Sequence, residues 1–129
     1  MSGRVLLNPP GGKVGKKSQA GLFYNKSANE WLSGNVDAVV FLAFTLELLR
    51  LLQGDCYLLS ALRFPICVPR ERLAFLTVVD GRAVPQTSPT HANAIILMPK
   101  TGADDELALF EQSFGQIGDV ILPKRPAVR

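Results

Sequence analysis

The stretch that decides the fold is Ala38–Leu52, AVVFLAFTLELLRLL. Only Thr45, Glu47 and Arg50 interrupt its apolar residues. A helix that is apolar on nearly all sides is buried in a core, in a partner or in a membrane. These 15 residues are fewer than the roughly 20 that a membrane-spanning helix needs, and Glu47 and Arg50 are spaced to pair on one helix face. The stretch therefore predicts a long buried helix of a soluble domain.

The composition is that of one domain with a real core. The chain has 129 residues, of which 47% are apolar and 19% are charged. This charged fraction is below the roughly 25% of typical soluble domains, which indicates that another molecule covers part of the surface. The first residues contain no long apolar segment of a signal peptide. The two cysteines lie in apolar runs and suit a reducing cytoplasm.

Short apolar runs predict the strands. Pro65 and Pro69 enclose 66–68, which predicts a loop or a sheet edge. The polar segment 82–93 contains two prolines and predicts a loop that follows the turn Asp80-Gly81. The runs that predict strands are 5–7, 56–62, 73–79, 94–98 and 119–122.

Capping residues predict the helix ends. Ser27 and Glu30 form a capping box that begins a short helix, and Gly34 ends it. Asn35 then caps the long helix. An amphipathic helix follows at 103–115, between two predicted strands that we expect to pair in parallel.

These elements predict an α/β fold. We expect a single domain in which a small mixed sheet of four or five strands packs with the long buried helix and the second amphipathic helix. The predicted organisation is a flexible basic N-terminal arm at 1–21, the core at 22–123 and a basic C-terminal end at 124–129. Because this end carries no closing element, we expect 1–129 to be the stable core of a longer protein with a flexible tail.

Positive charge gathers at the two ends of the chain. Residues 1–26 hold five basic side chains and no acid, and three more basic residues follow 123. Basic ends on a nearly neutral middle suit a polyanionic partner, although solvated tails would show the same pattern. The candidate RNA-binding residues are Lys13, Lys16, Lys17, Lys124, Arg125 and Arg129.

No motif predicts catalysis, a cofactor or a metal. The glycine- and lysine-rich segment 11–18 lacks the glycine and the hydroxyl residue of a phosphate-binding loop. His91 is the only histidine, and Cys56 and Cys67 are spaced unlike zinc ligands. The acidic residues 104–106 are explained by a helix N-terminus. The residue pattern alone therefore identifies no catalytic, cofactor or metal site.

Taken whole, the chain resembles the small accessory packaging protein in the polymerase complex of segmented double-stranded RNA bacteriophages, the cystoviruses. The resemblance covers the start MSGRVLLNPPGGKVGKKS, the apolar AVVFLAFTLELLRLL and the closing DVILPKRPAVR. It implies a non-enzymatic protein without a cofactor, a homodimer that stabilises the assembling procapsid and assists packaging of single-stranded RNA. The implied partners are the viral polymerase, the packaging ATPase and the inner shell protein. The implied location is the inner core of the virion, with the host cytoplasm during assembly.

Two further expectations concern surfaces. A small sheet cannot cover the long helix on all sides, so Leu48 and Leu51 are candidate contacts in a dimer. The alternative function is that of a small cytoplasmic α/β ligand-binding domain or enzyme. It would have a closed apolar pocket with convergent polar groups near His91 and Cys67.

Overall fold

The computed structural model describes residues 3–9, 13–15, 17–53, 59–71, 76–85, 92–100 and 104–129. Its helices are α1 (Gln19–Leu32), α2 (Glu47–Leu51) and α3 (Asp104–Phe114), with a 3₁₀ turn η1 (Ala61–Arg63). Its strands are β1 (Arg4–Leu7), β2 (Lys13–Val14), β3 (Lys17–Ser18), β4 (Ala38–Ala43), β5 (Ile66–Pro69), β6 (Leu76–Val79), β7 (Arg82–Pro85), β8 (Ala94–Met98) and β9 (Gly118–Ile121).

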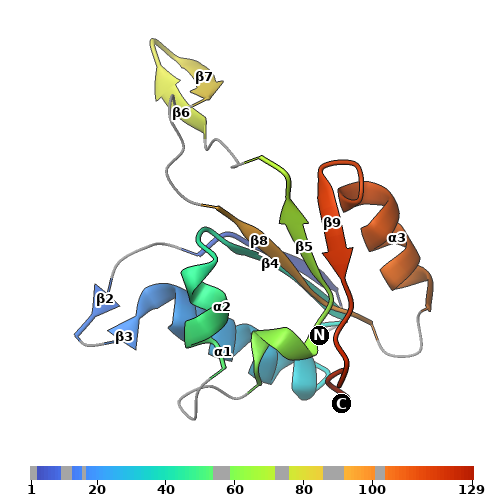
Figure 1. The fold of residues 1–129 in the computed structure, drawn as a ribbon. Helices are drawn as coiled ribbons and strands as arrows, with labels where there is room; N and C mark the ends of the chain where they lie inside the picture. Colours follow the sequence, from blue (N-terminus) through green and yellow to red (C-terminus); the bar gives the residue numbers. More distant parts are fainter. Residues whose placement is uncertain are drawn as a thin grey trace.

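Five of these strands form the central sheet, in the order β1-β4-β8-β5-β9. β1 runs parallel to β4, and the other neighbours are antiparallel. The pairs β2–β3 and β6–β7 form two small hairpins. Figure 1 shows α1 and α2 on one side of the sheet and α3 on the other. The predicted α/β class with a mixed sheet is confirmed.

The predicted long helix at 38–52 was wrong. Its first half is β4, in the middle of the sheet, and only Glu47–Leu51 is helical. Val39 and Phe41 face the α1 side, while Val40 and Leu42 pack toward α3. A strand covered on both faces is apolar at every position, so its pattern resembles that of a buried helix. The predicted pairing within the helical half is confirmed, because Arg50 Nε donates to Glu47 Oε1 over 2.6 Å.

Helix α1 begins earlier than predicted. Ser18 is its N-cap and accepts a hydrogen bond from the backbone nitrogen of Gly21 over 3.2 Å. Ser27, the predicted cap, lies inside the helix and donates to the carbonyl of Phe23. The end at Gly34 is confirmed, since this glycine has a φ of 77° just after the C-cap. The predicted capping role of Asn35 was wrong because the segment it would cap is β4; its amide donates to Glu30 instead.

The segment 66–68, predicted as a loop or a sheet edge, is a strand, and so are the first four residues of the predicted loop 82–93, of which 86–91 lie outside the described residues. β5 lies inside the sheet between β8 and β9, and β7 pairs with β6 across the predicted turn at Asp80-Gly81. β8 and β9 both run antiparallel to β5. They therefore point the same way, as predicted, but they are not neighbours because β5 separates them. The predicted strands at 94–98 and 119–122 are confirmed as β8 and β9, with β9 at Gly118–Ile121. At 73–79, strand structure is confirmed for β6.

The remaining predicted strand, 56–62, is only partly within the described residues, where Ala61–Arg63 is a 3₁₀ turn. The sheet also extends into the predicted N-terminal arm, since β1 pairs with β4 along its whole length. Among the described helices, none is long and apolar enough to cross a membrane.

The sheet separates two apolar cores. The larger one lies under α1 and α2 and contains Tyr24, Trp31, Phe41, Phe64 and Met98. The smaller one lies under α3 and contains Cys67, Ile95, Leu97 and Phe110. β8 contributes alternate residues to both cores and is buried throughout, so it is the central support of the fold.

Candidate functional site

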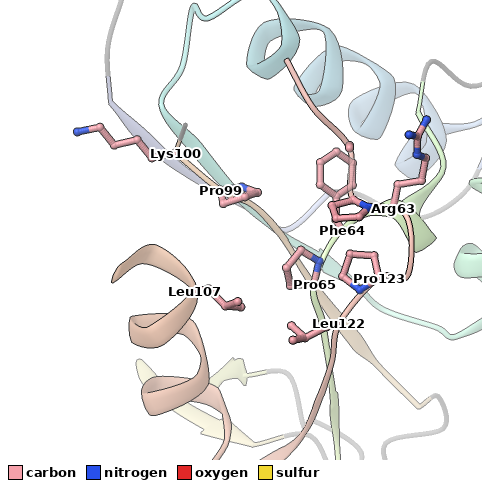
Figure 2. A pocket seen from close by; sticks show the side chains of 10 residues that line it. Arg63, Phe64, Pro65, Pro99, Lys100, Leu107, Leu122 and Pro123 are labelled. Atoms are coloured by element: carbon pink, nitrogen blue, oxygen red, sulfur yellow. The ribbon is translucent and has the colours of Figure 1, made fainter. Parts of the chain in front are cut away.

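A groove opens where β8, η1, α3 and the end of the chain meet (Figure 2). It encloses about 570 Å³. Leu107 of α3 lies on one side, and Leu122 and Pro123, which follow β9, lie on the other. The remaining apolar walls are Phe64, Pro65, Pro99, Pro126 and Ala127. We call this space the C-terminal groove.

The C-terminal segment that walls the groove is fastened to η1. The backbone nitrogen of Ala127 donates to the carbonyl of Arg63 over 2.8 Å. In return, Arg63 Nε donates to the carbonyl of Arg125 over 3.3 Å. These two bonds hold the segment beside the end of η1, so this wall of the groove has a fixed position.

Arg129 fastens the same segment to the end of α1. Its guanidinium donates to the carbonyl of Trp31 over 2.6 Å and to that of Val36 over 2.9 Å. A third bond reaches the carbonyl of Asp37 over 3.1 Å, and the guanidinium carbon lies 4.9 Å from the centre of the Trp31 ring. A cation at a helix C-terminus satisfies free carbonyls and opposes the helix dipole. The charge of Arg129, a predicted RNA-binding residue, is thus directed into the fold.

The floor of the groove is rigid as well. The Phe64 ring is buried and packs edge-on against Trp31, with the ring centres 5.2 Å apart. The Trp31 indole nitrogen donates to the carbonyl of Pro99 over 2.7 Å. Four prolines in the walls have fixed φ angles. The groove is therefore largely preformed.

All the charge on the described lining of the groove is positive. It comes from Arg63 and Lys100, and both side chains are exposed. Lys124 and Arg125 are also exposed, and they lie in the segment that forms one wall. The described lining contains no carboxylate, histidine, thiol or hydroxyl group. Such a site can hold an anion.

The predicted RNA-binding residues are divided between two places. Lys124 and Arg125 lie beside the groove. Lys13 and Lys17 lie in the β2–β3 hairpin, which Figure 1 shows well away from the C-terminus. Lys16 is outside the described residues. The sequence reasoning missed Arg63 and Lys100, because only the folded chain brings them to the same groove.

The predicted dimer contacts lie in the larger core, under α1 and α2. Leu48 is 3% exposed, and Leu51 is half-buried against the same cluster. The side chain of Leu48 is therefore packed inside its own chain and cannot contact a second copy. Leu51 keeps part of its surface exposed, so it stays a candidate dimer contact, and the homodimer stays a prediction.

The other chemical candidates give no active site in the described residues. Cys67 is fully buried, and its thiol lies 3.5 Å from the carbonyl of Phe114. Burial, followed by the charge of Asp119, raises the pKa of this thiol and disfavours the reactive thiolate. His91 and Cys56 lie outside the described residues.

The acidic start of α3 has a structural role. Glu106 is buried and accepts a hydrogen bond from Arg4 Nε over 2.9 Å, which joins β1 to α3. This bond and the charge of Glu106 raise the pKa of the Arg4 guanidinium. Within the described residues, no group of three or more potential ligands is placed to hold a metal ion.

The sequence matches no protein-family model, and no curated protein or solved structure is significantly similar to the chain.

Proposed function

We propose that this chain is a non-enzymatic viral inner-core protein that binds single-stranded genomic RNA and aids its packaging during procapsid assembly. The observation that carries the proposal is the C-terminal groove, where Arg63 and Lys100 are joined by Lys124 and Arg125. Two of these cations line the groove and two lie in the segment that forms one of its walls, and this concentration of positive charge favours a polyanion over a neutral ligand.

These cations would bind the phosphates of RNA and not its bases. Lysine and arginine side chains bind phosphates without reading the sequence, so the protein binds many RNA sequences with similar affinity. A packaging cofactor needs this property, because it handles whole genome segments. The described groove supplies no acid–base pair, which supports a binding role over a catalytic one.

The viral setting rests on the resemblance, and exposed apolar side chains support protein partners. Leu6 on the edge strand β1 is 78% exposed, and Ile121 on the opposite edge strand β9 is 57% exposed. The unpaired backbone groups of such edge strands can pair with another chain. We propose that the partners are a second copy of this chain, the viral polymerase, the packaging ATPase and the inner shell protein.

The test is the salt dependence of RNA binding. Fluorescence anisotropy with a labelled 20-nucleotide single strand gives the dissociation constant at several salt concentrations. Each phosphate neutralised on a single strand contributes about 0.7 to the slope of log K against log salt. If each of the four cations neutralises one phosphate, the slope of log K against log salt should be about −3.

Charge variants locate the contact. The double variant Lys124→Gln/Arg125→Gln should weaken binding and reduce the slope by about 1.4. Arg82→Gln is the matched control, because Arg82 is exposed on the distant β6–β7 hairpin and its loss should change the slope little. Absence of salt-dependent binding, or an equal effect of both variants, would contradict the proposal. Light scattering of the same samples tests the dimer.

The volume of the groove supports a second candidate, a small ligand-binding domain. About 570 Å³ lies within the range of small-molecule pockets, roughly 300–1,000 Å³. This function predicts that a compact anionic ligand binds the groove while RNA does not. The anisotropy experiment separates the two functions, because only the RNA-binding protein gains affinity as the strand is lengthened.

A further inference from the structure

We propose that the C-terminal groove receives the base of an unpaired nucleotide, while the cations at its mouth hold the neighbouring phosphates. This inference rests on the proposed RNA-binding function and adds a binding subsite to it. It assigns a role to the apolar walls, which phosphate binding alone does not use.

The apolar walls suit the faces of a planar ring. Leu107 and Leu122 face one another from different elements, and Figure 2 shows both side chains directed into the space between them. Pro65 and Pro123 add apolar ring surfaces beside Leu122. The described walls present few polar side-chain groups that could read the edge of a base. The pocket would therefore accept any base, as sequence-tolerant binders of single strands do.

The charge at the mouth selects the occupant. Arg63 and Lys100 belong to the lining, Lys124 and Arg125 adjoin it, and no carboxylate belongs to the described lining. The ligand must then combine an apolar insert with negative charge on both sides of it. A single-stranded nucleic acid has this pattern at every residue, because a base lies between two phosphates. An acidic peptide has it only where a large apolar side chain stands between carboxylates.

The fixed walls favour binding. The C-terminal segment is held by Arg63 and Arg129, and the Phe64 floor is held by Trp31. A preformed pocket avoids most of the entropy cost of ordering loops and side chains on binding. One inserted base can therefore add measurable affinity to the phosphate contacts.

The experiment compares two labelled RNAs that differ only in their bases. A ten-nucleotide oligouridylate and an abasic oligoribonucleotide of equal length carry the same phosphates. Anisotropy titrations at one salt concentration should show that the oligouridylate binds at least about fivefold more tightly, which corresponds to about 40 Å² of apolar surface buried at about 25 cal/mol per Å². Leu107→Asn and Leu122→Asn should each bring the two affinities together.

The control variant is Leu109→Asn. Leu109 and Leu122 are equally exposed, at 52% each, but Leu109 lies on α3 outside the groove. Its substitution should leave the preference for the oligouridylate unchanged. Two groove variants on different elements guard against a folding defect in either one, and circular dichroism confirms the fold of all three.

The remaining outcomes separate the two proposals. Equal binding of both RNAs to the unaltered protein would overturn the base pocket and leave the RNA-binding function standing. Failure of both RNAs to bind would overturn both. A third probe, the peptide acetyl-DLEDLEDLE-amide, tests the other occupant. If this peptide binds more tightly than the oligouridylate and Leu107→Asn abolishes its binding, the groove is a peptide site and the base pocket is wrong.

Discussion

Removing one oxygen atom from the core should make this protein more stable. Tyr24 of α1 is completely buried, and its ring packs edge-on against Phe41 with the ring centres 5.3 Å apart. Its hydroxyl is buried without a hydrogen-bond partner among the described residues. Tyr24→Phe keeps the ring contact and removes the unpaired hydroxyl.

The expected gain follows from the cost of burying that group. A buried polar group without a partner costs about 1–3 kcal/mol, because it loses its hydrogen bonds to water. The small space left by the oxygen takes back part of this gain. Tyr24→Phe should therefore raise the free energy of unfolding by about 1 kcal/mol.

Urea unfolding at pH 7 measures this change, and the single tryptophan is its reporter. Trp31 is buried against Phe64, so its fluorescence should change when the domain unfolds. The midpoint should move to higher urea with an unchanged m-value. A loss of stability of about 1 kcal/mol or more is the cost of losing a buried hydrogen bond. Such a loss would refute the reasoning, because it would mean that the Tyr24 hydroxyl forms a hydrogen bond in solution.

The same substitution predicts a pH dependence. Burial raises the pKa of the Tyr24 hydroxyl above its ordinary value, which is about 10 in an unfolded chain. Above that pH the unfolded chain loses this proton while the folded protein keeps it. The contribution of Tyr24 to stability is therefore complete below about pH 10 and falls by about 1.4 kcal/mol per pH unit above it. The advantage of Tyr24→Phe should grow between pH 10 and 11, and a constant advantage would contradict this.

Two further substitutions test contacts between elements. Gly118→Ala should lower the free energy of unfolding, measured in urea, by about 1–3 kcal/mol. A Cβ at Gly118 would lie 2.2 Å from the carbonyl oxygen of Val68 and 2.6 Å from Cα of Pro69. Unchanged stability would mean that β9 does not pack so closely on β5. Arg4→Met should lower the melting temperature by leaving Glu106 buried without its cation, and Arg4→Met/Glu106→Gln should recover part of the loss; no recovery would show that the pair is not coupled.

The elements that the sequence predicted correctly carry a local signal. Ala94–Met98 is a short apolar run, and Asp80-Gly81 is a turn in which both residues have positive φ angles. The prediction of one helix at Ala38–Leu52 was wrong because β4 and α2 follow one another without a glycine or proline between them. The change from β-branched residues at Val39-Val40 to leucines after Thr45 was the available signal, since these residue types favour strands and helices respectively.

Only some of the cations at the candidate site could be predicted from the sequence. Lys124 and Arg125 stand out as a basic end, but Arg63 and Lys100 are ordinary loop residues when they are read along the chain. They come together because β5 pairs with β8. This pairing brings the residues before β5 close to the residues after β8, since the two strands are antiparallel. Such non-local proximity depends on strand order, which the pattern of one sequence does not contain.

Trp31 explains why core and site cannot be separated in this fold. Its ring faces Phe64 on the floor of the groove, its indole nitrogen holds Pro99 at the end of β8, and its face carries the guanidinium of Arg129. The Phe64 floor, the end of β8 and the C-terminal segment that carries Arg129 are thus joined through one side chain on α1. The groove keeps its shape only while α1 remains packed on the sheet, so core contacts such as that of Tyr24 also set the geometry available to a ligand.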